Sequence, residues 1–132
     1  MDKARIMIVE DEPALREVLA EALDHVGYST QTVPDGRSLM QRLESDLPDL
    51  ILLDIGLPDV SGWELQKQLQ NDARYNKVPV IAVTGYGGAH VEQSAIKTLH
   101  FADYIRKPYS LADLMNRIEV VLEKKPQKQA MH

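Results

Sequence analysis

The sequence predicts an α/β domain built on a doubly wound, five-stranded parallel sheet. Short apolar runs alternate along the chain with segments whose apolar residues recur at helical spacing. The runs begin near residues 5, 28, 50, 78 and 102, and each interval has room for one strand and one helix. Two runs, residues 50–53 and 80–83, are almost wholly apolar, which is typical of strands buried on both faces of a parallel sheet. Helices are therefore expected on both sides of the sheet.

The individual elements follow from the local pattern, in chain order. Strands are expected at residues 5–9, 28–33, 50–53, 78–84 and 102–106. The second of them is polar (YSTQTV), which favours an edge position in the sheet. The first and last helices show a clear i, i+3, i+4 apolar pattern, formed by Leu15, Val18, Leu19, Ala22, Leu23 and Val26 and by Leu111, Leu114, Met115, Ile118 and Leu122. Weaker helical patterns cover residues 36–44, 62–72 and 88–99.

The composition excludes several classes of function. The chain has 132 residues, a net charge of -5 and no cysteine. Disulfides, thiolate zinc sites and cysteine nucleophiles are therefore excluded, and the acidic balance argues against direct binding to nucleic acid. No run approaches the roughly 18 apolar residues of a membrane span, and acids at residues 10–12 come too early for a signal peptide. We expect one cytoplasmic domain without a membrane segment.

Charged and polar residues stand where the predicted strands end. Glu10 and Asp11 follow the first strand, Asp54 ends the third, Thr84 ends the fourth and Lys107 follows the fifth. The carboxyl ends of parallel strands meet at one edge of the sheet, where open α/β proteins bind their ligands. We therefore expect acids, a hydroxyl and an ammonium group to share one crevice.

The expected cluster of acids points to a divalent cation and to phosphate. Two carboxylates about 4 Å apart repel each other by roughly 4 kcal/mol at an effective dielectric constant near 20. Mg²⁺ relieves such repulsion, because it binds a few carboxylate oxygens and keeps several waters. A carboxylate beside Mg²⁺ can attack a phosphoryl group, whose oxygens Lys107 and Thr84 would stabilise. The predicted chemistry is phosphoryl transfer onto Asp54.

Each of these residues also has a purely structural interpretation. Asp54 could form a turn or cap a helix, and the acids at residues 10–12 could favour the start of the first helix through its dipole. Thr84 could be an ordinary strand residue and Lys107 a solvated charge. The placement of each group at the end of a different strand is what favours a functional site.

Four segments carry a resemblance to a known family: IMIVEDEPALR, DLILLDIGLPDVSGWEL, VPVIAVTGYG and ADYIRKPYSLADL. In this order and spacing, the chain resembles the receiver domain of two-component response regulators, of the single-domain chemotaxis type. The resemblance covers residues 4–123 and leaves residues 124–132 as a polar C-terminal tail or linker remnant. It implies a flavodoxin-like (βα)5 fold with strand order 2-1-3-4-5, and a role in phosphorelay signal transduction.

The resemblance also implies a role for each acidic residue. Asp54 would be the phosphoacceptor, which takes a phosphoryl group from a histidine kinase or a histidine phosphotransfer protein. Mg²⁺ would be bound by Glu10, Asp11, Asp54 and the backbone carbonyl of Gly56. Asp11 is the expected direct ligand, and Glu10 is expected to act mainly through water. The domain would catalyse its own phosphotransfer and slow autodephosphorylation, as a signalling domain and not as an enzyme with a separate substrate.

The remaining matched residues would transmit the signal. Thr84 and Tyr104 match the switch hydroxyl and the switch aromatic residue, and Lys107 matches the family lysine, whose bond to Pro108 is usually cis. Phosphorylation would switch binding of a downstream protein, which the sequence does not name, or relay the phosphate onwards. No output domain follows in the sequence, so output is expected through a partner, unless the chain comes from a hybrid kinase or a larger regulator. A homodimer through the fourth and fifth helices is compatible with the resemblance.

Two positions depart from the commoner family pattern. Glu10 stands where aspartate is commoner, so an altered metal affinity is expected. Gly56 leaves the crevice open beside the phosphoryl group, so an altered rate of autodephosphorylation is expected. Two alternatives remain. A phosphate-independent, receiver-like binding module would usually lose an acceptor, acid or lysine, and a phosphatase of the haloacid-dehalogenase type would need a second acid at position 56.

Overall fold

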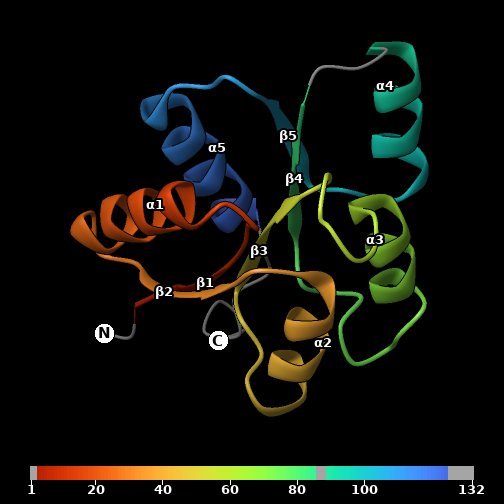
Figure 1. Ribbon diagram of the computed structural model, residues 1–132, viewed down its shortest axis with the longest axis horizontal. Coiled ribbons are helices and arrows are strands. Elements are labelled where there is room, and N and C mark those ends of the chain that lie inside the picture. The colour runs from red at the N-terminus through yellow and green to blue at the C-terminus, as the bar shows by residue number, and fades with distance from the viewer. Residues whose placement is uncertain (1–2, 86–88, 125–132) are drawn as a thin grey trace.

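Over the residues that the structure describes, 3–85 and 89–124, the computed structural model forms a five-stranded parallel sheet with five helices (Figure 1). The order is β1 (Arg5–Val9), α1 (Pro13–His25), β2 (Ser29–Val33), α2 (Gly36–Ser45), β3 (Leu50–Asp54), α3 (Gly62–Gln70), β4 (Val80–Thr84), α4 (Ala89–Thr98), β5 (Asp103–Arg106) and α5 (Leu111–Lys124). The strands pair in the order β2-β1-β3-β4-β5, all in parallel. The predicted fold class and strand order are confirmed.

Two predicted features involve residues outside 3–85 and 89–124. The predicted tail, residues 124–132, lies outside the described residues except for Lys124, so the domain boundary stays a prediction. Gly88, the first residue of the predicted fourth helix, also lies outside them. Among the described helices, none is long and apolar enough to cross a membrane.

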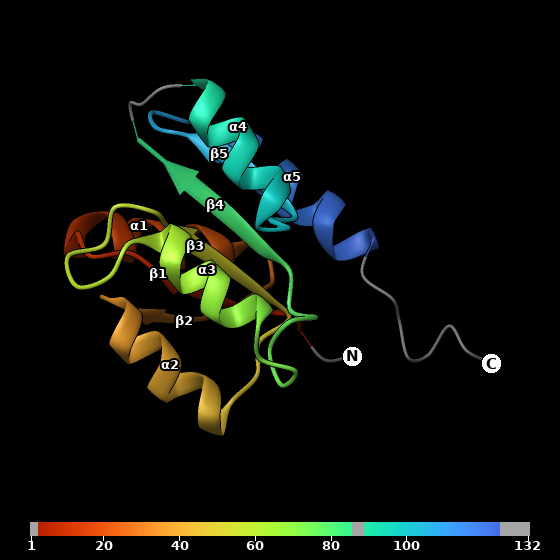
Figure 2. The ribbon, with the colours of Figure 1, turned by 90° about the vertical axis from the view of Figure 1, so that its right-hand side faces the viewer.

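Helices cover both faces of the sheet. In Figure 1, α1 and α5 lie on one side of the strands and α2, α3 and α4 on the other, the side that faces the viewer in Figure 2. Successive strand side chains point to opposite faces, so each central strand contributes to two hydrophobic cores. One core joins α1 and α5 to Ile6, Ile8, Leu50, Leu52, Ile81 and Val83. The other joins α2 and α3 to Met7, Val9, Ile51, Leu53, Val80 and Ala82.

The burial of the strands agrees with the pattern in the sequence. Every residue of β3 and β4 is buried, whereas Val33 is the one buried residue of β2, which lies at the sheet edge as predicted. The first strand matches its prediction, and the other four differ from theirs by one or two residues at their ends. For example, β4 begins at Val80 and not at Val78, because the amide of Val78 donates to the carbonyl of Tyr75 at 3.0 Å and closes a turn.

The loop between β3 and α3 brings the chain back onto the end of β3. The amide of Gly62 donates to the carbonyl of Ile55 at 2.8 Å, and Ser61 caps α3 by accepting from the amide of Glu64 at 3.2 Å. A Cβ atom on Gly62 would lie 2.6 Å from Cα of Ile55 and 3.1 Å from the carbonyl oxygen of Asp54. The start of α3 can therefore approach Asp54 this closely because residue 62 is glycine.

We expect Gly62→Ala to lower the free energy of unfolding by about 1–3 kcal/mol, because the added methyl group meets backbone atoms that cannot rotate away. Gly85→Ala is the matched control, since a Cβ atom there meets nothing within 4 Å, and its effect should stay within about 0.5 kcal/mol. Urea unfolding followed by circular dichroism measures both. Equal unfolding midpoints for the two variants would contradict the close approach of α3 to β3.

Candidate functional site

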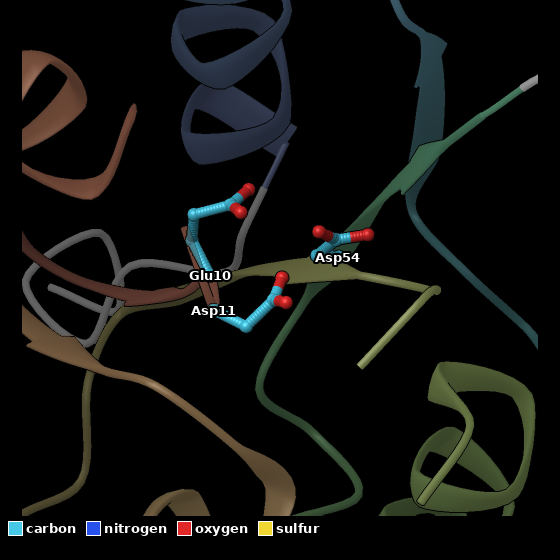
Figure 3. A group of neighbouring side chains, drawn as sticks. All are labelled: Glu10, Asp11 and Asp54. Atoms are coloured by element: carbon cyan, nitrogen blue, oxygen red, sulfur yellow. The ribbon is translucent and has the colours of Figure 1, made fainter. Parts of the chain in front are cut away.

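Three acidic side chains meet at the carboxyl edge of the sheet (Figure 3). Glu10 and Asp11 follow β1, and Asp54 is the last residue of β3. One carboxylate oxygen of each residue lies within 4.8 Å of the others. Glu10 is 3% exposed and Asp54 is 6% exposed, whereas Asp11 is exposed. The cluster is therefore buried at its base and open to solvent at Asp11.

Lys107 reaches the same cluster from the loop that follows β5. Its Nζ atom lies 3.1 Å from Oδ2 of Asp54 and 3.6 Å from Oε1 of Glu10. The amide of Lys107 donates to the carbonyl of Thr84 at 2.8 Å, which fixes this loop to the end of β4. The peptide bond from Lys107 to Pro108 is cis. One ammonium group thus pairs with two buried carboxylates from neighbouring strand ends.

Burial and charge act against each other in this cluster. Burial raises the pKa of Glu10, and the charge of Asp54 adds to this, although the amide of Glu12 and the charge of Lys107 oppose it. Burial by itself would lower the pKa of Lys107, but the charges of Asp54 and Glu10 raise it. Burial therefore disfavours the ionised form of Glu10 more than Lys107 favours it, and a divalent cation beside the acids would favour their ionised forms.

Asp54 is oriented by the first residues of the loop after β3. Its Oδ1 atom accepts a hydrogen bond from the amide of Gly56 at 2.9 Å, which leaves Oδ2 facing Lys107. Gly56 is exposed, and a Cβ atom at this position would lie 3.7 Å from Oδ1 of Asp54. The side chain of any larger residue at position 56 would therefore start next to the Asp54 carboxylate.

Thr84 places a hydroxyl group at the adjacent strand end. Asp54 pairs with Val83 in the sheet, so Thr84 lies one residue beyond it on β4. Its side chain is 2% exposed, and its Oγ1 atom has no hydrogen-bond partner in the described part of the chain. A buried, unpaired hydroxyl costs free energy, so a ligand with acceptor oxygens would give it a partner.

Tyr104 lies on the neighbouring strand β5, opposite Ala82 of β4. Because residues 82 and 84 point to the same face of β4, Tyr104 shares that face with Thr84. The Tyr104 side chain is half-buried and packs against the core on the α2–α3 side. The structure therefore brings the three acids and Lys107 together. It places Thr84 at the neighbouring strand end and Tyr104 on the same face of the sheet as Thr84.

Two residues near the acids were not predicted. Arg16, in the first turn of α1, donates from Nη1 to the carbonyl oxygen of Glu10 at 2.8 Å. Tyr109 has a buried hydroxyl with no partner among the described residues, and its pKa is raised by burial and by the charge of Glu10. Both lie within motifs quoted above, but a motif does not show which way a side chain points in the folded chain.

Asp59 was also missed, and it ties the loop after β3 to the start of α2. Its carboxylate accepts hydrogen bonds from the amides of Gly36 and Arg37, both at 3.0 Å, and of Val60 at 2.9 Å. Burial by itself would raise the pKa of Asp59, but these amide donors lower it. The ionised carboxylate therefore stabilises the loop that carries Gly56.

We expect Asp59→Asn to be less stable than the native chain at pH 7, by about 1 kcal/mol or less because the group is exposed to solvent. The folded-state pKa is lowered, so the native advantage is complete above the unfolded pKa of about 3.9 and is lost as the pH falls through the folded pKa. Urea unfolding at pH 7 and at pH 3 measures the change. A difference between the two proteins that is as large at pH 3 as at pH 7 would contradict this role of the Asp59 charge.

The geometry can be compared with known proteins. Residues 6–119 match the family model of the response regulator receiver domain. The chain belongs to this family. The predicted resemblance is therefore confirmed, and the receiver domain is the signalling domain of two-component systems.

Curated relatives and solved structures agree with this assignment. The receiver domain is 36% identical over 120 residues to the phosphate regulon transcriptional regulatory protein PhoB of Rhizobium meliloti, covering 91% of this chain and 52% of that protein. It is 32% identical over 120 residues to the response regulator MprA of Mycolicibacterium vanbaalenii, covering 91% of this chain and 51% of that protein. The chain thus spans about half the length of the curated relatives it matches.

Among solved structures, the receiver domain is similar to the CheY-like response regulator receiver domain protein of Methanospirillum hungatei. The TM-score is 0.86 at 27% identity, covering 94% of this chain and 97% of that one. The signal receiver domain of a signal transduction histidine kinase from Syntrophus aciditrophicus gives a TM-score of 0.84 at 28% identity, with 95% and 96% covered. Receiver domains of this fold therefore occur both in response regulators and in kinases.

Proposed function

We propose that this receiver domain takes a phosphoryl group onto Asp54 in a reaction that depends on Mg²⁺. The donor would be the phosphohistidine of a histidine kinase or of a histidine phosphotransfer protein. One observation carries the proposal: separate strand ends bring three carboxylates within 4.8 Å of one another, with the Lys107 ammonium group 3.1 Å from Asp54. The unpaired hydroxyl of Thr84 at the next strand end supports it.

The donor atoms suit Mg²⁺. Proteins hold this ion through a few carboxylate oxygens, water and substrate phosphate, and Glu10, Asp11 and Asp54 offer carboxylates in one cluster. We propose Asp11 as the direct ligand, with Glu10 acting mainly through water, and the carbonyl of Gly56 as a further ligand. When bound, Mg²⁺ would supply positive charge that neutralises phosphoryl oxygens and offsets the repulsion among the acids.

Asp54 would act as the nucleophile. One carboxylate oxygen forms a bond to phosphorus while the phosphorus–nitrogen bond of phosphohistidine breaks, and the electron pair leaves with the imidazole, which takes up a proton. Lys107 already contacts Oδ2 of Asp54, so its ammonium group can contact the phosphoryl oxygens as negative charge moves onto them. The Thr84 hydroxyl would donate to another of these oxygens. The same residues would support slow autodephosphorylation by water.

The signal would leave the site through Thr84 and Tyr104. A phosphoryl group adds about 1.5 to 2 negative charges and strong acceptor oxygens. Movement of Thr84 toward these oxygens would make room for Tyr104, which lies on the same face of the sheet, to turn inward. The two arrangements would differ in population and not in fold. The altered surface around β5 would change the binding of a downstream protein or support a homodimer through α4 and α5. Alternatively, the domain would relay the phosphate onwards. Each of these events would take place in the cytoplasm.

Intact mass spectrometry after incubation with acetyl phosphate tests the proposed function. We expect a gain of one phosphoryl group with Mg²⁺ present and no gain after chelation with EDTA. No gain with Mg²⁺, under conditions that label a known receiver domain, would favour the phosphate-independent binding module. A Mg²⁺-dependent change in Trp63 fluorescence with beryllofluoride would distinguish that outcome from a phosphoryl group that is lost too quickly to detect.

We expect Gly56→Asn to shorten the lifetime of the phosphoryl group. A carboxamide that starts next to the Asp54 carboxylate could hold the attacking water, and one such hydrogen bond, worth about 1 kcal/mol, corresponds to about a fivefold change in rate. Gly56→Ala is the control, because it adds a side chain without a polar group. Loss of phosphoryl mass over time, after removal of acetyl phosphate, gives the rates. Equal lifetimes for the native chain and Gly56→Asn would contradict the prediction.

A further inference from the structure

The loop that carries the acidic pair is held by a cation from the helix that follows it. Nη1 of Arg16 lies 2.8 Å from the carbonyl oxygen of Glu10 and 3.4 Å from that of Asp11. These carbonyls belong to consecutive peptide groups, so a single nitrogen of the guanidinium group restrains both. Nη1 lies one bond farther from the backbone than the ammonium nitrogen of a lysine would, and the stiff guanidinium group loses less freedom when it is held.

The two acids differ in how firmly they are held without Arg16. The amide of Glu10 donates to the carbonyl of Val33 at 3.1 Å, and its Oε2 atom accepts from the amide of Glu12 at 3.0 Å. Its Oε1 atom faces Lys107 at 3.6 Å. Asp11 is exposed, and within residues 3–85 and 89–124 the contact from Arg16 is the one hydrogen bond that it makes. Arg16 therefore holds the backbone carbonyl of Asp11, from which the carboxylate side chain extends.

We propose that Arg16 is a positioning residue for the metal site. By holding the carbonyls of Glu10 and Asp11, it fixes the backbone from which the Asp11 carboxylate points toward Asp54 in Figure 3. The inference rests on the proposed function, because it assumes that Mg²⁺ binds between these acids. Residues that hold metal ligands in place commonly change metal affinity when they are replaced.

The charge of Arg16 and its positioning contacts should affect the Mg²⁺ affinity in opposite directions, so a measured affinity can distinguish between them. A guanidinium group near three carboxylates repels a divalent cation, so removing its charge alone would tighten Mg²⁺ binding. Losing the positioning contacts would weaken Mg²⁺ binding, because the loop would then have to become ordered when the ion binds. A role confined to supporting α1 would change stability and leave the affinity unchanged. The three explanations predict three different results.

The test is the Mg²⁺ dissociation constant of the full chain, measured by isothermal titration calorimetry. We expect Arg16→Met to weaken binding about tenfold, as replacements of residues that support metal ligands commonly do. Arg16→Lys keeps the charge, but its ammonium nitrogen sits one bond nearer the backbone than Nη1 of arginine and should hold the two carbonyls less closely, so it should weaken binding about threefold. Arg37→Met, which removes an exposed arginine at the start of α2, controls for net charge and should change the affinity less than about twofold.

A second readout needs no metal. The amide of Glu12 donates to the Glu10 carboxylate, so its hydrogen exchange in metal-free protein reports how well the loop is ordered. We expect faster exchange at Glu12 in Arg16→Met and Arg16→Lys than in the native chain, with unchanged exchange in the core strands.

Tighter or unchanged Mg²⁺ binding in the Arg16 variants would overturn the inference. If Arg16→Met does not fold, Arg16→Lys decides the question, since an explanation based on charge alone predicts no change for it. If the native chain itself does not bind Mg²⁺, the proposed function fails. If the native chain binds Mg²⁺ and the variants bind it equally well, only the role of Arg16 is refuted.

Discussion

Asp54→Ala is expected to abolish the Mg²⁺-dependent gain of a phosphoryl group while the domain stays folded. The substitution removes the proposed nucleophile from the centre of the acidic cluster. The fold should survive, because the buried residues Leu50–Leu53 of β3 supply the packing on both faces of the sheet. The Asp54 carboxylate itself contacts the amide of Gly56 and the ammonium group of Lys107, and neither contact belongs to the hydrophobic cores.

Asp54→Asn is the stricter control for this prediction. It keeps an oxygen that can accept from the amide of Gly56, so it removes the nucleophile with the least change in shape. Both variants should show native circular dichroism and no gain in intact mass with acetyl phosphate and Mg²⁺. Their Mg²⁺ affinity should also fall, because one ligand is lost. An undiminished gain in mass in both variants would place the acceptor elsewhere.

Lys107→Ala is expected to slow phosphorylation of Asp54 by about 10²–10³-fold, the usual cost of removing one group that stabilises charge in a transition state. The Lys107 ammonium group is the cation that the structure places within 4 Å of both Asp54 and Glu10. Without it, the negative charge that moves onto the phosphoryl oxygens would lose a direct partner. The initial rate of mass gain at fixed Mg²⁺ and acetyl phosphate measures the effect.

Two further variants separate this role of Lys107 from a general effect of charge. Arg106→Ala removes an exposed cation one residue earlier in the chain and should change the rate little. Lys107→Arg keeps the charge but alters its geometry, so it should retain part of the rate. A Lys107→Ala rate close to the Arg106→Ala rate would show that the ammonium group does not act on the transferred phosphoryl group.

The fold could be predicted because apolar residues recur differently along buried strands and along helices, and this difference can be seen in short stretches of sequence. The continuous apolar runs of β3 and β4 indicated buried central strands, and the polar run of β2 indicated an edge, as observed. The ends of elements were less predictable, since they depend on single hydrogen bonds. For example, the contact between the Val78 amide and the Tyr75 carbonyl delays the start of β4.

The site could be predicted in part, because strand ends of a parallel sheet must meet. From the sequence alone, that rule predicts that Glu10, Asp11, Asp54, Thr84 and Lys107 lie at one edge of the sheet. It could not show that Glu10 is buried while Asp11 is exposed, because burial depends on the path of the loop after β1.

The supporting residues could not be predicted at all. Arg16 occupies a position in α1 that reads as ordinary helical surface, yet its side chain turns back to the loop before the helix. Gly62 begins a weak helical pattern and Asp59 stands in no pattern of its own, yet Asp59 accepts hydrogen bonds from the start of α2 and Gly62 permits the close approach of α3 to β3. These contacts join segments whose relative placement is set by the whole fold.

The central claim is that Asp54 is the residue that receives the phosphoryl group, and chemical trapping tests it most directly. The protein would be incubated with acetyl phosphate and Mg²⁺ and then treated with borohydride, which reduces an aspartyl phosphate to homoserine. Peptide sequencing by mass spectrometry would locate the product. We predict homoserine at position 54, and none there when Mg²⁺ is chelated. Homoserine at Asp11 or at another acid, with Asp54 unchanged, would contradict the account.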